Sequence, residues 1–138
     1  MKKHAVTLLI LALVALPGLV NAQSRKIIKA EVPFEFVAGG KAMPAGECTI
    51  EVRGDSQTIL WISSGDQHLF AMPNSTESLN PSDDTKLVFN RYGDRYFLST
   101  ISREGENRGY ELPVGKLEAE LRAQNVARSN VTLVASSK

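Results

Sequence analysis

Cysteine, histidine and an excess of charge of either sign are what this sequence lacks most clearly. Its 138 residues include one Cys and two His, and 16 Lys and Arg stand against 15 Asp and Glu. With Cys48 as the only cysteine, the chain cannot form an internal disulfide. Because the positive and negative side chains are nearly equal in number and interspersed, there is no basic stretch to attract nucleic acid. We expect no nucleic-acid partner.

Side chains that hold metals or act as catalytic bases are also scarce. After the first 22 residues His68 is the only histidine, and a zinc ion would have to share it with Cys48 on a different strand. A Ser-His-Asp hydrolase would have to use His68 with Asp66. Its nucleophile would be Ser63 or Ser64, and no nucleophile-elbow glycines surround these serines. We therefore expect no metal, no cofactor and no enzymatic activity; a hydrolase that uses His68 remains an alternative.

The beginning of the chain has the features of a secretory signal peptide. A positively charged start (MKK) precedes an apolar run over residues 5–20, and short side chains follow up to Ala22. We expect cleavage after Ala22, so that residues 1–22 are removed and residues 23–138 form a single exported domain, periplasmic or secreted. A membrane-spanning helix needs about 20 apolar residues. Since Pro17 and Gly18 interrupt the run, we expect no stable membrane anchor after cleavage.

The rest of the chain consists of short apolar or alternating segments separated by turn residues. The clearest pair lies in the stretch 85–102 (TKLVFNRYGDRYFLSTIS), where two aromatic and β-branched runs flank Gly93 and Asp94. Gly and Asp adopt the backbone angles of a tight turn at little cost, so this stretch predicts a central β-hairpin. Regularly spaced strands predict a mainly β fold, a single small antiparallel β-barrel or β-sandwich of about seven to eight strands with one short helix.

Further elements are expected on both sides of this hairpin. A strand over 26–37 contains Pro33, which has no N–H to donate, so the strand should have a free side or a bulge there. The apolar period changes near 114–124, where Leu117 and Leu121 lie four residues apart and predict the helix. Other strands are expected at 47–53, 57–63, 68–72, 108–112 and 130–135, with an irregular loop over 73–84 and a loose tail over 136–138.

Cys48 lies in a segment of strict alternation between apolar and polar residues. Cys48, Ile50 and Val52 share one face of the expected strand. This pattern predicts that Cys48 is a small buried hydrophobe. A reactive thiol or an intermolecular disulfide is the alternative interpretation.

Aromatic side chains provide the main candidate for binding. In a small domain most of them are expected to pack in the core or across strands. A rim at the central turn could instead contact a ligand, and the candidate binding residues there are Arg91, Tyr92, Asp94, Arg95 and Tyr96. We therefore expect a non-enzymatic binding or interaction module, whose unknown partner is a protein, a small molecule or a glycan. The alternative is a carrier that holds a small apolar ligand in a barrel cavity.

Several motifs resemble those of an uncharacterised family of small exported bacterial β proteins, associated chiefly with Acidobacteria and related soil bacteria. They are VPFEF at 32–36, PAGE at 44–47, KLVFNRYGD at 86–94, YFL at 96–98 and ELP at 111–113. The resemblance covers most of residues 23–138 and implies export and the fold, but no activity. Relatives usually have Tyr where Cys48 stands and often His where Asn90 stands. A family site that used that His is therefore missing here.

Overall fold

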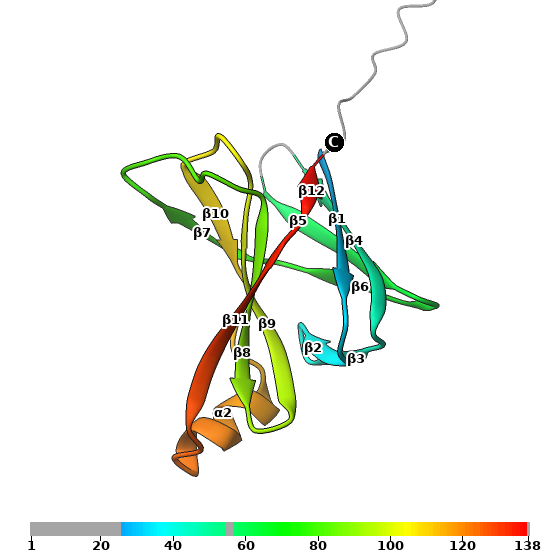
Figure 1. The fold of residues 1–138 in the computed structure, drawn as a ribbon, viewed down its shortest axis with the longest axis vertical. Helices are drawn as coiled ribbons and strands as arrows, with labels where there is room; N and C mark the ends of the chain where they lie inside the picture. Colours follow the sequence, from blue (N-terminus) through cyan, green and yellow to red (C-terminus); the bar gives the residue numbers. More distant parts are fainter. Residues whose placement is uncertain (1–25, 55–56, 138) are drawn as a thin grey trace, which may run out of the picture.

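The computed structural model describes residues 26–54 and 57–137, which form a mainly β structure with two sheets and one short helix (Figure 1). The predicted signal peptide over 1–22 lies outside these residues. The elements, in chain order, are β1 (Lys26–Val32), β2 (Phe36–Ala38), β3 (Lys41–Met43), β4 (Gly46–Arg53), β5 (Ile59–Ser64), β6 (Gln67–Ala71), β7 (Asn74–Glu77), β8 (Lys86–Tyr92), β9 (Arg95–Ser102), β10 (Arg108–Glu111), α2 (Lys116–Ala123), β11 (Arg128–Val134) and β12 (Ser136–Ser137).

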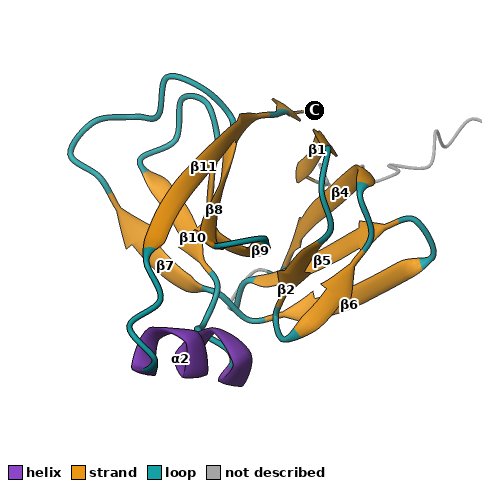
Figure 2. Ribbon diagram, turned by 60° about the horizontal axis from the view of Figure 1, so that its bottom comes forward, coloured by secondary structure: helices purple, strands orange, loops and turns teal. Residues whose placement is uncertain are grey.

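Two mainly antiparallel sheets carry the fold. The five-stranded sheet has the order β12-β1-β4-β5-β6, and the seven-stranded sheet contains β11-β8-β9-β10-β7. The hairpin β2–β3 belongs to the second sheet, because β2 pairs in parallel with β9. Among the described residues the strands do not close into a barrel (Figure 2). Twelve strands are described instead of the seven or eight expected, since short strands such as β3, β7 and β12 contain too few apolar residues to be recognised.

The chain crosses from one sheet to the other at Pro33. β1 ends at Val32 in the five-stranded sheet, and β2 begins at Phe36 in the seven-stranded sheet. The prediction of one continuous strand over 26–37 is therefore wrong. Proline has no N–H with which to continue the ladder, and the predicted irregularity at this residue takes the form of a complete break.

A second crossing occurs at Ala135, near the end of the described chain. β11 pairs with β8, whereas β12 pairs with β1, placing Ser136 opposite Lys29 and Ser137 opposite Ile28. The prediction of a loose tail is wrong for these two residues. Backbone pairing depends little on side-chain type. It therefore orders this segment, although the segment's composition does not predict a strand.

The central hairpin is confirmed. β8 and β9 pair from Lys86 opposite Ser102 to Tyr92 opposite Arg95, and the register shifts once, where β9 has the extra residue Ser99 opposite the step from Val88 to Phe89. Gly93 has a φ of 61°, and Asp94 is not among the residues with positive φ. A positive φ at the first of two turn residues is typical of a type II′ turn, whose twist matches that of the paired strands.

The core lies between the two sheets and is almost wholly apolar. Phe89 of β8 meets two other rings edge-on, Phe34 at 5.1 Å and Phe36 at 5.4 Å between ring centroids. Cys48 is buried, as the alternation predicted. Burial raises the pKa of its thiol from 9.0 to about 12 because the charged thiolate would lose its hydration. Fully buried side chains from both sheets include Ile28, Ile50, Leu60, Ile62, Leu87 and Ile101.

The predicted helix is confirmed as α2, two residues shorter at its start and one at its end than the range 114–124. It lies beside the end of the seven-stranded sheet at which β8 and β9 meet (Figure 1). The loop predicted over 73–84 is irregular only in part, since residues 74–77 form β7 and pair with β10. The polar sequence NSTE gives no apolar alternation, and β10 supplies the pairing that makes it a strand.

Candidate functional site

The five residues predicted at the central turn do not gather on one surface. Asp94 and Arg95 are exposed at the turn, whereas Tyr92 is buried on the side that faces α2. Arg91 lies opposite Tyr96 across the hairpin, with its guanidinium 5.4 Å from the centre of that ring. The other contact of Tyr96 is a parallel stack on Phe34, at 3.8 Å between centroids. The side chains at the turn therefore point in different directions: some into solvent, Tyr96 toward Phe34, and Tyr92 toward α2.

The helix side of the hairpin contains a buried polar cluster that the sequence does not reveal. Glu118 of α2 is 6% exposed, and its Oε1 accepts hydrogen bonds from Asn90 Nδ2 at 2.8 Å and from Tyr92 OH at 3.0 Å. Arg122 Nη2 donates to the same oxygen at 3.3 Å, and Arg122 Nε donates to Tyr92 OH at 2.9 Å. The bond to Tyr92, with the charge of Glu118 nearby, raises the pKa of Arg122 above its ordinary value.

This cluster fastens α2 to the sheet by polar contacts more than by apolar ones. Glu118 is the only buried residue of the helix, and Leu117 is 39% exposed. A helix held by an apolar stripe would bury its leucines and expose its glutamates. Here one carboxylate is buried with its partners, and the helix consequently leaves space between itself and the neighbouring hairpin β2–β3.

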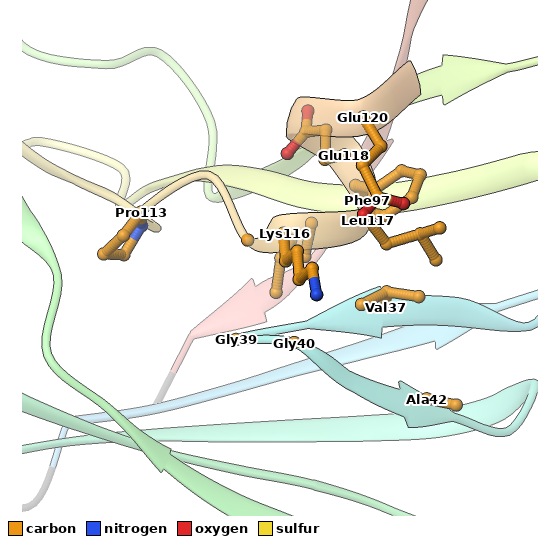
Figure 3. A pocket seen from close by; sticks show the side chains of 12 residues that line it. Val37, Gly39, Gly40, Ala42, Phe97, Pro113, Lys116, Leu117, Glu118 and Glu120 are labelled. Atoms are coloured by element: carbon orange, nitrogen blue, oxygen red, sulfur yellow. The ribbon is translucent and has the colours of Figure 1, made fainter. Parts of the chain in front are cut away.

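That space is a pocket of about 480 Å³ between α2 and β2–β3 (Figure 3). At the start of the helix the two walls approach closely, since a Cβ on Gly115 would lie 3.7 Å from the Cα of Gly40. β9 supplies the floor through Phe97 and Leu98, and most of the lining is hydrocarbon or backbone. The lining residues are Val37, Gly39, Gly40, Ala42, Phe97, Leu98, Pro113, Gly115, Lys116, Leu117, Glu118 and Glu120.

Three charged side chains line the pocket, and they differ in what they contact. Glu118 is occupied by the cluster with Arg122 described above. Lys116 extends its amine toward the hairpin β2–β3, and the carboxylate of Glu120 lies beside Phe97 (Figure 3). Among the described residues neither Lys116 nor Glu120 has an ion pair or a side-chain hydrogen bond. The pocket thus presents one ammonium and one carboxylate around an apolar floor.

A second surface with possible binding chemistry lies on the outer face of the five-stranded sheet. Trp61 of β5 packs against Phe70 of β6 at 4.2 Å and against His68 at 4.8 Å between ring centroids. The Arg53 guanidinium lies 5.5 Å from the Trp61 ring and 5.9 Å from the Phe70 ring, and it also pairs with Glu51. Phe70 is 59% exposed, which is unusual for so large an apolar side chain. We call Arg53, Trp61, His68 and Phe70 the aromatic patch.

The residues considered for a hydrolase are engaged in other contacts. Ser64 is buried and donates its hydroxyl to the carbonyl oxygen of Pro44 at 2.8 Å. Ser63 lies opposite His68 in the β5–β6 pairing, and the ring of His68 packs on Trp61. In residues 26–54 and 57–137, no hydrogen bond joins His68 to Asp66. No group of three metal-ligating side chains is found in the same part of the chain.

Comparison with known proteins finds no match: no family model fits the sequence, and neither the curated proteins nor the solved structures include a similar chain. The described residues contain no helix that is long and apolar enough to cross a membrane.

The pocket is the part of the candidate site that sequence reasoning missed. Its walls are the predicted helix and the turn at Gly39–Gly40, which joins β2 to β3. What brings them together is the pairing of β2 with β9, a parallel contact between segments some sixty residues apart. The sequence gave no signal for the pocket, since the position of Glu118 between Leu117 and Leu121 on a short helix does not indicate that its carboxylate is buried.

Proposed function

We propose that this protein is an exported, non-enzymatic binding module whose ligand occupies the pocket between α2 and β2–β3. The observation that carries the proposal is the pocket itself. Its volume of about 480 Å³ falls within the range of small-molecule sites, about 300–1,000 Å³, and its mixture of apolar lining with a few charged groups is typical of such sites. Export is supported by the N-terminal pattern and by the family resemblance.

The lining favours holding a ligand over transforming it. Its side chains are aliphatic or aromatic except for one amine and two carboxylates, and Glu118 is committed to Asn90, Tyr92 and Arg122. A carboxylate with three donors is well suited to keeping the helix in place. It is poorly placed to exchange protons with a substrate.

The pocket also replaces the barrel cavity as the location for a carrier function. The core side chains from both sheets form one contiguous cluster, and the pocket lies outside it, next to the helix. We infer that the two sheets form an open sandwich, and that an apolar ligand would be carried under α2.

Filling the pocket with a large side chain tests this proposal. Ala42 lines the pocket, and Ala45 is an exposed alanine three residues away that does not. The protein purified from a bacterial periplasm should show, in a native mass spectrum, an added mass that is lost on denaturation. Ala42→Trp should abolish the added mass and Ala45→Trp should not. A wild-type protein that remains bare after incubation with periplasmic extract, or an adduct indifferent to both substitutions, contradicts the proposal.

The aromatic patch favours a second candidate function, the binding of a neutral glycan. Phe70 is exposed, Trp61 packs against its ring, and Arg53 beside the two rings is paired with Glu51. Sugar rings present apolar C–H faces that pack on such rings, and polar groups at the edge supply hydrogen bonds. Affinity electrophoresis in neutral polysaccharides should retard the wild-type protein but not Phe70→Ala. The control is Leu79→Ala, which removes an exposed apolar side chain elsewhere.

A further inference from the structure

We propose that the ligand of the pocket is a short zwitterionic peptide of two to three residues with an apolar side chain. The inference rests on the proposed function, because it names the ligand class of the same pocket. It is carried by the two charges that the pocket presents without internal partners, the ammonium of Lys116 and the carboxylate of Glu120, which both project from α2 into the lining of the pocket (Figure 3).

The two charges do not satisfy each other. Lys116 and Glu120 are four residues apart on α2, a spacing at which an ion pair can form, yet no ion pair joins them. The order with Lys before Glu is the weaker of the two for such a pair. Both side chains belong to exposed residues, where an ion pair contributes little to stability. A ligand that offers a carboxylate to Lys116 and an ammonium to Glu120 therefore has no strong ion pair of the protein to break.

Glu118, the third charged side chain of the lining, cannot replace Glu120 as the partner of the ligand's ammonium group. Oε1 of Glu118 already accepts from Asn90, Tyr92 and Arg122, and the positive charge of Arg122 compensates its negative charge. In Figure 3 the carboxylate of Glu118 is directed away from the hairpin that forms the opposite wall. The charges left for a ligand are thus one of each sign, and a ligand with only one charge would leave the other unpaired.

The orientation of the ligand follows from the order of the charges along α2. Lys116 is the first residue of the helix, so the peptide carboxylate lies toward the positive end of the helix dipole and the ammonium lies toward Glu120. Helix residues four apart have Cβ atoms about 5–6 Å apart. An extended chain covers about 3.3–3.6 Å per residue, so two residues match this separation directly. A third residue is accommodated because both charged side chains are long.

The apolar part of the lining selects the side chain of the peptide. Val37, Ala42, Phe97 and Leu117 contribute hydrocarbon surface to the pocket. Burying an aliphatic or aromatic side chain there is favourable because it removes apolar surface from water. The glycines of the lining place no side chains in the space that the peptide backbone would occupy. An apolar dipeptide with free ends fits these requirements.

The test measures the binding of leucyl-phenylalanine by titration calorimetry, with its N-acetylated and C-amidated forms as probes. On the wild-type protein we expect each cap to raise Kd by up to about fivefold, since each cap removes the charge that pairs with one exposed side chain. In Glu120→Gln, N-acetylation of the dipeptide should hardly change Kd, while C-amidation should still raise it. In Lys116→Gln, C-amidation should hardly change Kd, while N-acetylation should still raise it. Lys29→Gln, a substitution on the five-stranded sheet, is the matched control and should behave as the wild type.

Several outcomes overturn the inference while leaving the proposed function standing. Among them are equal affinity for free and doubly capped dipeptides, or capping effects that neither substitution alters. Tighter binding of decanoate or decylamine than of any dipeptide would indicate a singly charged ligand. Failure of all these probes, together with an adduct in the native mass spectrum that Ala42→Trp removes, also rejects the peptide. If no adduct and no probe binding are found, both proposals fail. Because Lys116 and Glu120 are exposed, the circular dichroism and melting temperatures of their variants should match the wild type.

Discussion

At the scale of single residues, Glu118 decides where α2 lies. Three donors on β8 and on the helix itself converge on one of its oxygens, and no other helix residue is buried. Asn90 of β8 is one of these donors, so a substitution there would alter a contact that holds the helix against the sheet.

Removing the carboxylate of Glu118 should destabilise the protein. In Glu118→Ala the buried donors Asn90 Nδ2 and Tyr92 OH lose their acceptor, and we expect a loss of about 2 kcal/mol in the free energy of unfolding. Glu118→Gln keeps an acceptor oxygen and should cost less. Urea denaturation measures the effect, with Glu120→Gln as the exposed control on the same helix. Equal stability of Glu118→Ala and the wild type would show that the cluster does not hold the helix.

Cys48 should make stability fall at high pH. The folded protein raises the pKa of this thiol from 9.0 to about 12, so the folded state favours the protonated form. The contribution of the protonated thiol to the free energy of unfolding is complete below pH 9. It is lost as the pH rises from 9 toward 12, at about 1.4 kcal/mol per pH unit. At pH 10.5 the loss is about 2 kcal/mol. Denaturation at pH 8 and 10.5 should show this difference in the wild type and a smaller one in Cys48→Ala, which retains all other titrating groups.

At the scale of elements, the turn of the central hairpin sets the register of β8 and β9. Gly93→Ala should cost about 1–2 kcal/mol, because a side chain is strained at a φ of 61°. No atom lies within 4 Å of the added Cβ, so the cost comes from the backbone alone. Asp94→Ala, at the neighbouring turn position without positive φ, is the matched control and should change stability little. Thermal unfolding followed by circular dichroism compares the two, and similar melting temperatures would contradict the type II′ assignment.

Some strands could be predicted from the sequence and others could not. β4, β8 and β9 alternate or carry aromatic runs next to glycine turns, and their positions were predicted to within a residue or two. β7 and β12 are polar segments whose order comes from strands β10 and β1. The pattern that identifies a strand reports which face it buries, and these two strands bury almost nothing.

At the scale of the whole molecule, the compartment remains a prediction of the N-terminal pattern. When the full chain is expressed in a bacterial host, we expect the protein recovered from the periplasm to begin at Gln23, after cleavage at Ala22. Intact-mass spectrometry of the periplasmic and cytoplasmic fractions measures this. Replacing Ala22 with a large residue should slow the cleavage. An uncleaved protein in the cytoplasm would refute the export prediction.

The sequence by itself determined the mainly β class, the central hairpin, the short helix and the burial of Cys48. These follow from local periodicity and turn chemistry, which act between residues close together in the chain. Tertiary structure alone decided that the first predicted strand divides between two sheets, that Tyr92 faces the helix, and that the Gly39–Gly40 turn and α2 enclose a pocket. Each of these depends on contacts between distant segments, such as Asn90 with Glu118 or Val37 with Phe97. No local pattern specifies such a contact, because many apolar or polar partners would satisfy the same residues equally well.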